Sequence, residues 1–299
     1  MATTTRARKS PEQREGELKA MHSQIVDAVK NISDDETWTV YLDWCARFHN
    51  YSFNNVLLAH MQCAGRKMSD PTRLAPFAKW RDMGHTVRKG EKGLAIYAPM
   101  LVKIKPGEDG YVEGQNKQKL IGFRKAYVWD VQQVESPETV PANPATKAYE
   151  TDASGDVDPN VESGLDAFIR SLGYSVERGA TGSAAGYTDP KAKKIFLTDR
   201  RDAGSAAELV TKVYEVAHVL LHCGHEGEEF DYAKHRGQAE VEAEGTAYVV
   251  ARYFGIDSET HSAGYLAHWA NRDADVVVKA ANRITRTSKR IINAILDEI

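Results

Sequence analysis

The sequence predicts an α+β protein of two domains, and three observations support this prediction. Its 299 residues are 42% hydrophobic and 27% charged, the composition of a globular chain long enough for about two domains. Apolar residues recur at helical spacing through both halves, except at residues 92–134, which are rich in Val, Ile, Tyr and Phe. A Pro-, Ser- and Asp-rich segment without apolar periodicity predicts a linker at 136–159, between domains at 1–135 and 160–299.

The first half begins with helices and ends with strands. Ser33 and Glu36 form a capping-box pattern at the start of the second helix. The β-branched and aromatic stretches predict a pair of strands at 92–105 and 120–134, joined by a polar loop. The expected helices span 11–31, 33–48, 53–63 and 75–84. We therefore expect N-terminal helices plus a small β-sheet.

The second half reads as a hairpin followed by a helical core. The segment 184–199 predicts a β-hairpin with Asp189-Pro190 at its turn. Ser205 and Glu208 form another capping box, which starts the helix that carries the motif described below. The remaining expected helices span 160–172, 237–255, 262–270 and 276–296.

Charge is divided unevenly along the chain. Residues 1–135 hold 21 Lys and Arg against 16 Asp and Glu, a surplus of +5, whereas residues 136–299 hold 18 against 26, which gives −8. Such a split indicates that the first half is the part that meets a polyanion. The apolar runs fall short of the ~18 residues that a membrane span needs. With no signal core and three scattered cysteines, we expect a cytoplasmic protein without membrane contact.

The stretch VYEVAHVLLHCGH at 213–225 follows the zinc-binding pattern H-E-x-x-H with a tyrosine in the first position. On a helix, Tyr214, His218 and His222 form one row because they are four residues apart, and Glu215 lies beside it. In the intact pattern two imidazoles hold the metal and the glutamate acts on its bound water. This spacing makes Glu215 the candidate catalytic residue and His218 the secure metal ligand.

The later helix supplies a candidate third ligand. Glu240 and Glu244 stand at i and i+4, so that Glu240 can bind the metal while Glu244 orients an imidazole from behind. Glu242 lies about 200° away at ~100° per residue, so we expect it in solvent. His222 either packs under the next loop or substitutes as a ligand, and His225 and His235 are loop histidines or weaker substitutes.

A phenol is a poorer zinc ligand than an imidazole. Its unperturbed pKa is about 10, so Tyr214 must ionise before it can bind. Only His218 and Glu240 then remain as strong ligands, whereas catalytic zinc normally has three protein ligands. The site therefore reads as a descendant of a zinc site in which zinc binding is weakened or lost.

The first half also carries features of a surface for single-stranded nucleic acid, which combines positive charge with aromatic platforms. A Gly-rich turn in KWRDMGHTVRKGEKG groups several cations, and the strands add more. Trp80, Phe53, Tyr51 and Tyr97 are possible stacking surfaces, although Phe77 and Trp80 also fit a short helix packed into the core. The candidate DNA-binding residues are Lys79, Trp80, Arg81, Arg88, Lys89, Lys92, Lys103, Arg124 and Lys125. No base-reading motif is visible, so binding should tolerate sequence and depend steeply on salt.

Together, YSFNNVLLAHMQ, PFAKWRDMGHTVRKGEKGLAIYAP and the pair YEVAHVLLH and EVEAEGTAYVVARYFG resemble the ArdC-type antirestriction proteins. The resemblance covers most of residues 20–270. It implies an N-terminal domain that binds single-stranded DNA and a C-terminal zincin-like metallopeptidase domain similar to the ImmA/IrrE group. By position it gives Tyr214 the first ligand's place, Glu215 the catalytic glutamate's, and His218 and Glu240 those of the other ligands. It also implies a plasmid or phage protein that protects incoming DNA.

Three functions remain open. The first is a single-stranded-DNA-binding antirestriction protein with a degenerate metallopeptidase domain. The second is an active zinc peptidase that uses Tyr214 or another residue as a ligand and cleaves a repressor or restriction-related protein. The third is a scaffold that docks on a protein partner, although the basic last helix complicates it. That helix carries Lys279, Arg283, Arg286, Lys289 and Arg290.

Overall fold

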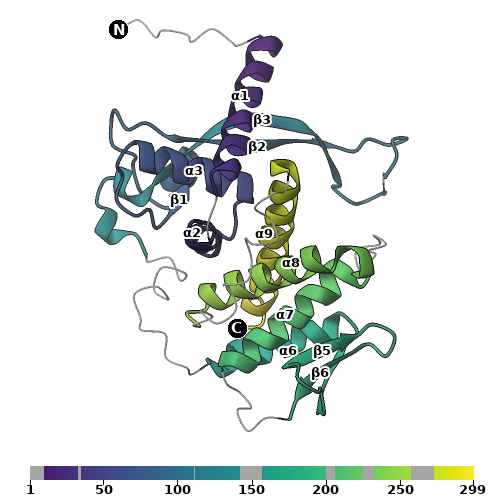
Figure 1. Ribbon diagram of the computed structural model, residues 1–299. Helices are drawn as coiled ribbons and strands as arrows, with labels where there is room; N and C mark the ends of the chain where they lie inside the picture. Colours follow the sequence, from purple (N-terminus) through teal and green to yellow (C-terminus); the bar gives the residue numbers. More distant parts are fainter. Residues whose placement is uncertain are drawn as a thin grey trace, which may run out of the picture. The chain divides into compact units, whose positions relative to one another are not determined.

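The computed structural model describes residues 10–32, 35–110, 112–141, 157–199, 206–224, 232–256 and 273–299. These residues form two compact units (Figure 1). The first unit contains the described parts of Met1–Ala28 and Leu57–Val140, and the second unit those of Val29–Val56 and Pro141–Ile299. Each combines helices with a small sheet, which confirms the predicted α+β class.

Residues 29–56 pack with the second unit, although the sequence places them in the first predicted domain. Helix α2 (Asp35–Arg47) lies against α8 (Tyr232–Tyr253). The Asp43 carboxylate accepts a hydrogen bond of 2.7 Å from the Tyr248 hydroxyl and lies 3.0 Å from Arg252 Nε. Amino-acid composition cannot reveal such a long-range contact. The division of the structure into units therefore differs from the domain boundary predicted from the sequence.

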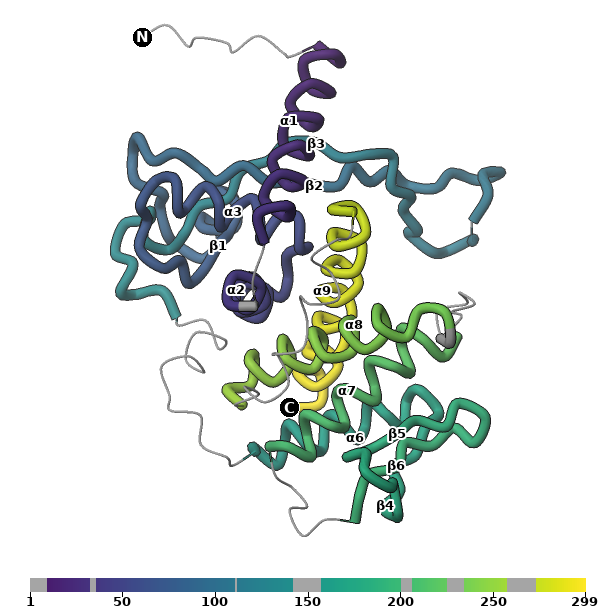
Figure 2. The backbone as a smooth tube through the Cα atoms, viewed as in Figure 1, coloured from purple at the N-terminus to yellow at the C-terminus, as the bar shows by residue number. Residues whose placement is uncertain are grey.

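The first unit is built on an antiparallel sheet with strand order β1-β3-β2. The long pair β2 and β3 confirms the strand pair predicted from the β-branched and aromatic residues. Figure 2 traces the two strands as a ribbon that extends beyond α1. The elements of this unit are α1 (Pro11–Lys30), α3 from Leu57 (the helix spans Phe53–Gly65), β1 (Leu74–Ala75), α4 (Phe77–Asp82), β2 (Leu94–Lys103), β3 (Gln118–Asp130), η1 (Val131–Gln133) and η2 (Pro137–Thr139).

Two side chains fasten helices to this sheet. The Gln62 amide of α3 behaves as an extra strand residue: it accepts from the Ala95 N–H at 2.8 Å and donates to the Ala95 carbonyl at 2.9 Å. The indole of Trp80 is fully buried and donates to the Trp129 carbonyl at 3.0 Å. Both bonds satisfy polar groups at the sheet, whose burial would otherwise cost free energy.

The second unit combines a small mixed sheet with packed helices. Strands β5 and β6 form the predicted hairpin, and β4 pairs parallel with β6, giving the order β4-β6-β5. The sequence did not indicate β4 because SVERG has no apolar run or alternation. The elements besides α2 and α8 are α6 (Pro159–Ser171), β4 (Ser175–Gly179), β5 (Gly186–Asp189), β6 (Lys194–Thr198), α7 (Ala206–His222) and α9 (Ala274–Leu296).

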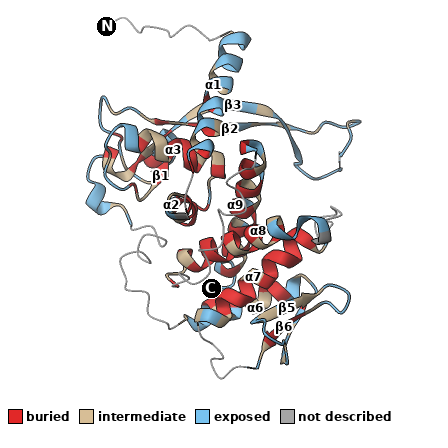
Figure 3. Ribbon diagram, in the orientation of Figure 1, coloured by how far each residue is buried: buried red, intermediate tan, exposed pale blue. Residues whose placement is uncertain are grey.

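Helix α7 is the centre of this unit, and most of its length is buried (Figure 3). Its Val213, Val216 and Leu220 join a core with α6, β6, α8 and α9. The buried Lys212 ammonium contacts Glu162 at 2.8 Å and Asp166 at 3.1 Å, so the cation is paired as burial requires. A buried, immobile helix can hold reactive side chains in fixed positions.

Some predicted features lie outside the described residues, namely Ser33, Ser205, His225 and the helix at 262–270. In the part of the chain that the structure describes, none of the helices has the length and hydropathy needed to cross a membrane.

Candidate functional site

A cavity of about 500 Å³ lies where α7, α8 and β5 meet in the second unit. Helix α7 packs against both other elements, which Figure 1 shows beside it. The cavity collects the row predicted from the altered zinc pattern, because residues four apart share a face. The side chains with polar or reactive groups that line it are Tyr214, Glu215, His218, His222, Cys223, Arg236 and Glu240, with Thr188 on the β5 side.

Tyr214 and Glu240 meet across the two helices. The Tyr214 hydroxyl donates a hydrogen bond to Glu240 Oε2, and Arg236 Nε lies 3.7 Å from Glu240 Oε1. The rings of Tyr214 and His218 are 4.7 Å apart in edge-to-face contact. The phenol therefore stands beside both predicted strong ligands and bonds to one of them.

Glu215 is held in place by a residue of β5. Its Oε2 accepts a 2.8 Å hydrogen bond from the Thr188 hydroxyl on β5. Burial raises the pKa of the Glu215 carboxyl to about 7, with the Glu240 charge adding to the rise and the Thr188 bond opposing it. Such a carboxyl is close to half-protonated near neutral pH, which suits a general acid or base.

A chain of buried polar groups runs behind the cavity from His218. Its Nδ1 lies 3.0 Å from His222 Nδ1, and His222 Nε2 lies 3.0 Å from Glu242 Oε2. If His222 donates from Nε2 to the carboxylate, its Nδ1 must accept from His218 Nδ1. Burial, with the neighbouring His222, lowers the pKa of His218 to about 4, so this imidazole is neutral.

The sequence predicted that Glu242 lies in solvent, and the structure shows that this prediction is wrong. Its side chain is fully buried, accepts a hydrogen bond of 2.8 Å from Gln238 Nε2 and forms an ion pair with Arg283, whose Nε lies 3.1 Å away. The carboxylate that contacts the His222 imidazole is thus Glu242, two residues before the predicted Glu244. Helix α8 has packed neighbours on several sides, namely α2, α7 and α9, so a position opposite Glu240 is also interior. Burial, followed by the charge of Glu240, raises the pKa of Glu244 to about 7.

The donor set does not fit a zinc ion well. Among the described residues, no group of three or more His, Cys, Asp and Glu side chains could hold a metal. His218 and Glu240 supply two strong donors, and the third position is a phenol whose hydroxyl already bonds to Glu240. His222 is not a free substitute, since both of its ring nitrogens have buried partners. We derive no catalytic step through a metal here.

A second candidate site is one face of β2 and β3 in the first unit, which α1 covers in part at Tyr97 and Lys125. The register pairs Tyr97 with Lys125, Pro99 with Phe123 and Ala95 with Tyr127, so alternation places these side chains on one face. Tyr127 and Phe123 are 45% and 47% exposed. Further along, Phe77 is 50% exposed and meets the half-buried Trp129 edge-to-face at 5.9 Å. We name Phe77, Phe123, Tyr127 and Trp129 the aromatic face.

The aromatic face replaces the stacking residues suggested by the sequence. Trp80 and Phe53 are fully buried, so their rings cannot stack on a base. Tyr97 is half-buried under α1, where its hydroxyl donates to the Leu18 carbonyl at 3.1 Å. The missed signal was the alternation of Phe123, Lys125, Tyr127 and Trp129, which puts one ring or cation on the same face at every second residue.

The predicted cations are spread over this unit with different roles. Lys125 Nζ lies 5.7 Å from the centre of the Tyr127 ring and 3.8 Å from Glu17. The remaining predicted cations, except Arg88, have exposed side chains. These are Lys79, Arg81, Lys89, Lys92, Lys103 and Arg124.

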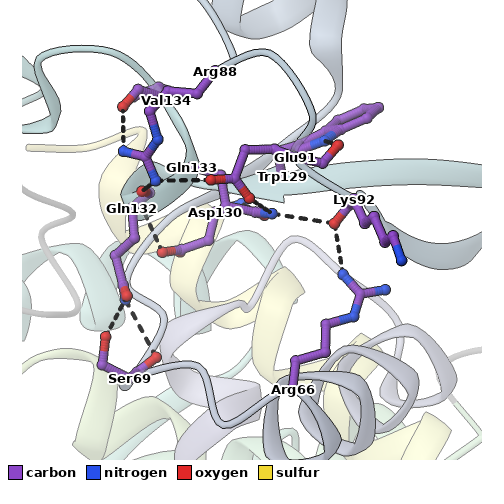
Figure 4. Close-up of polar contacts among 10 residues, drawn as sticks. All are labelled: Arg66, Ser69, Arg88, Glu91, Lys92, Trp129, Asp130, Gln132, Gln133 and Val134. Carbon is purple, nitrogen blue, oxygen red and sulfur yellow. Dashed lines mark hydrogen bonds and ion pairs between the residues drawn. The ribbon is translucent and has the colours of Figure 1, made fainter.

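Arg88 instead braces the loop that contains it (Figure 4). Its guanidinium donates to the Val134 carbonyl at 3.1 Å, to the Gln132 carbonyl, and to Glu91 at 2.9 Å. From the other side, Arg66 donates to the Lys92 carbonyl at 2.6 Å. The Gly-rich turn is thus a fixed loop that presents Lys89 and Lys92 outward, not a loose hairpin.

Glycine at position 93 lets this loop lie close to the aromatic face. A Cβ there would lie 2.9 Å from the Trp129 ring and 2.9 Å from Tyr127 Cβ. Only a residue without a side chain permits this approach, so the cationic loop and the aromatic face form one continuous surface.

The fold and sites define a class: an α+β protein with a sheet-based basic and aromatic surface in one unit and a polar cavity on a buried helix in the other. Residues 17–129 match the family model of the N-terminal domain of anti-restriction factor ArdC. This part of the chain is therefore similar to the N-terminal domain of ArdC. The match crosses the division between the units, because it includes residues 29–56.

Whole-chain comparisons give three further similarities. The chain is similar to the crystal structure of antirestriction protein ArdC from plasmid R388 in its Mn(II)-bound form, at 18% identity and TM-score 0.53, covering 93% of this chain and 97% of that one. The metal-free form gives 19% identity and TM-score 0.49, covering 82% and 85%. At this identity the Mn(II)-bound form shows a shared fold. An uncharacterized protein of Bacillus anthracis is 24% identical over 96% of this chain, which spans about half of that protein (52%).

Proposed function

We propose that this protein is an ArdC-type antirestriction protein of a plasmid or phage that binds single-stranded DNA through the aromatic face. Its second unit is then a zincin-like, metallopeptidase-like domain whose metal site is degenerate. The observation that carries the proposal is the row of rings on β3, with the exposed Phe77 of α4, beside a cationic loop. The relative with the same fold comes from a plasmid and is named for antirestriction, which is consistent with the proposal.

Exposed rings on a strand favour single strands over duplexes. Unstacked bases present their faces to a ring, whereas the bases of a duplex are already stacked on each other. Tyr127 and Phe123 stand four residues apart on β3, which separates them by about 13 Å at ~3.3 Å per residue. The face can therefore engage more than one base of the same strand. Lys125 stands between them, where it can contact the backbone phosphates that join those bases.

The test is the affinity of the full chain for a fluorescent oligothymidine, measured by anisotropy at low salt. Each stacked base contributes about 1–3 kcal/mol, so the double variant Phe123→Ala/Tyr127→Ala should bind roughly 25-fold weaker or worse. Leu101 and Leu120 face each other on the same strands and are 51% and 53% exposed. The matched variant Leu101→Ala/Leu120→Ala removes apolar area but no ring, so it should bind almost as the wild type does.

Two results would oppose this function. Wild-type protein that binds no single strand at low salt, or that prefers duplex, contradicts it directly. Equal losses in the aromatic and aliphatic variants would mean that the surface is merely apolar and does not stack on bases.

A second function is favoured by one observation, the buried Glu215 with its raised pKa in a cavity of about 500 Å³. It is an active zinc-dependent peptidase that uses Tyr214 or another substitute ligand and cleaves a repressor or restriction-related protein. Metal analysis of the purified chain separates the two functions. About one zinc per chain that is lost in Glu240→Ala supports the peptidase, and a metal-free chain supports the degenerate site.

A further inference from the structure

The second unit has a groove on the outer side of α9 that the functions above do not use. The groove encloses about 710 Å³, a larger space than the cavity on α7. It lies between α9 and the turn at residues 50–52, with Gln238 of α8 at its edge. All of these elements belong to the second unit. We name it the α9 groove.

Cations line the α9 groove along the length of the helix. Lys279, Arg286 and Lys289 stand on its wall, and Lys279 and Arg286 are exposed. Seven residues separate Lys279 from Arg286, which places both on one helix face at ~100° per residue. The opposite face of α9 is buried in the core through Ile284, Ile291 and other apolar residues. The basic last helix is therefore amphipathic, and its charges are gathered on the side that the core leaves open.

The described lining of the groove holds cations but no carboxylate. The eleven lining residues in the described part of the chain contain no Asp or Glu. Arg283, the fourth cation of the lining, is the one that reaches inward to Glu242, 3.1 Å away. The remaining polar lining includes Asn50, Ser52 and Asn282, and the Asn282 amide already donates to Asn54 Oδ1 and to the Val278 carbonyl. Cations on a lining without acids suit an anion.

The position of this site contrasts with the charge of the sequence around it. The sequence of this unit, residues 29–56 and 141–299, carries 20 Lys and Arg against 29 Asp and Glu, so most of the unit repels a polyanion. A polyanion that approaches the unit is directed to the groove because the cations there are concentrated on one face.

We propose that the α9 groove binds the phosphate backbone of a nucleic-acid strand, as a second contact site separate from the aromatic face. Lys279 and Lys289 are ten residues apart, which is about 15 Å along a helix at 1.5 Å per residue. A nucleic-acid strand in a duplex carries one charge per about 3.4 Å of axis, so the groove spans several phosphates rather than one. This length assigns the groove to a polynucleotide and not to a mononucleotide.

The choice of single-stranded DNA as the probe rests on the proposed function, and two measurements on the full chain test the site itself. The first is the salt dependence of oligothymidine binding in Lys279→Gln/Arg286→Gln/Lys289→Gln. Single strands release about 0.7 counterions per phosphate contact, so losing three contacts should lower the slope of log K against log salt by about 2. The matched control is Arg170→Gln/Lys191→Gln/Arg290→Gln, in the same unit with the same change of charge.

The control cations lie outside the groove. Arg170 and Lys191 are exposed on α6 and on the turn between β5 and β6, and Arg290 lies 6.0 Å from the Phe168 ring. Melting curves of both triple variants establish that each remains folded. The control should keep the wild-type slope.

The second measurement is the acylation of individual lysines, followed by mass spectrometry, with and without the oligonucleotide. Bound DNA should protect Lys279 and Lys289 severalfold and leave Lys191 unchanged. Deoxythymidine monophosphate alone should protect neither, and equal protection by it would overturn the assignment to a polynucleotide.

The outcomes separate this site from the aromatic face. If the groove variant binds like its control and its lysines stay reactive while Phe123→Ala/Tyr127→Ala loses binding, the groove proposal fails and the proposed function stands. If the groove lysines are protected but the aromatic variant binds normally, the groove stands and the aromatic face fails. A wild-type chain that binds no strand at all overturns both.

Discussion

Replacing Glu242 by alanine removes the centre of the buried polar chain behind the cavity. The side chain is fully buried and contacts His222 at 3.0 Å, Gln238 at 2.8 Å and Arg283 at 3.1 Å. Breaking a buried ion pair from one side typically costs about 3–5 kcal/mol because the other charge stays buried without compensation. For a unit of this size, such a loss should lower the melting temperature on the order of 10 °C.

The measurement is urea unfolding of the full chain followed by circular dichroism. Glu244→Ala is the matched control, since it removes a half-buried carboxylate two residues away on the same helix, and it should change the unfolding free energy by less than about 1 kcal/mol. The double variant Glu242→Ala/Arg283→Met should recover part of the loss, because it also removes the stranded cation. A cost for Glu242→Ala as small as that of its control would refute the buried network.

Three further predictions concern other parts of the chain. Burial lowers the pKa of His49 from 6.5 to about 4, and the Lys289 charge adds to the shift. The unfolded state therefore binds a proton at higher pH than the folded state does. As pH falls from 6.5 to 4, up to about 3 kcal/mol of unfolding free energy should be lost. His49→Gln should flatten that part of a stability–pH curve, and an unchanged slope would count against the assignment. In Gly245→Ala the new Cβ would lie 2.7 Å from Ile284 Cδ1, so this variant should lose about 1–3 kcal/mol of unfolding free energy in urea. In Gly16→Ala the new Cβ has no heavy atom within 4 Å and the residue lies on a helix, so this variant should gain about 0.5–1 kcal/mol. The two variants should change the unfolding free energy in opposite directions. Equal changes would mean that helix propensity, and not packing against Ile284, determines the effect at Gly245. Tyr214→His should raise the zinc content measured by mass spectrometry to about one ion per chain, and a chain that stays metal-free would show that more than the first ligand has been lost.

The row on α7 was predictable because helical spacing alone brings Tyr214, Glu215 and His218 together. Spacing also identified Glu240 as the residue facing them from a later helix, and the structure joins it to Tyr214 by a hydrogen bond. The same reasoning failed for Glu242, since periodicity gives the direction of a side chain but not what packs there. Helix α8 is enclosed by α2, α7 and α9, and only the tertiary structure reveals that its second face is interior.

The nucleic-acid surface shows a different limit. Trp80 and Phe77 both lie on the short helix α4, and the sequence gives no reason to place one in the core and the other in solvent. The rings on β3 could have been found from alternation, because Phe123, Tyr127 and Trp129 share its parity. The α9 groove could not have been found, since it depends on a turn more than two hundred residues earlier in the chain.

The assignment of residues 29–56 to the second unit has a practical consequence for anyone who divides this polypeptide. The backbone passes from one unit to the other after Ala28, after Val56 and after Val140, so one cut in the linker cannot release two intact halves. A fragment beginning at 160 would lack α2, leaving Tyr248 and Arg252 without their carboxylate and an apolar face of α8 uncovered. Such a truncation should be recovered as aggregate, whereas co-expression with a peptide spanning 29–56 should restore soluble material.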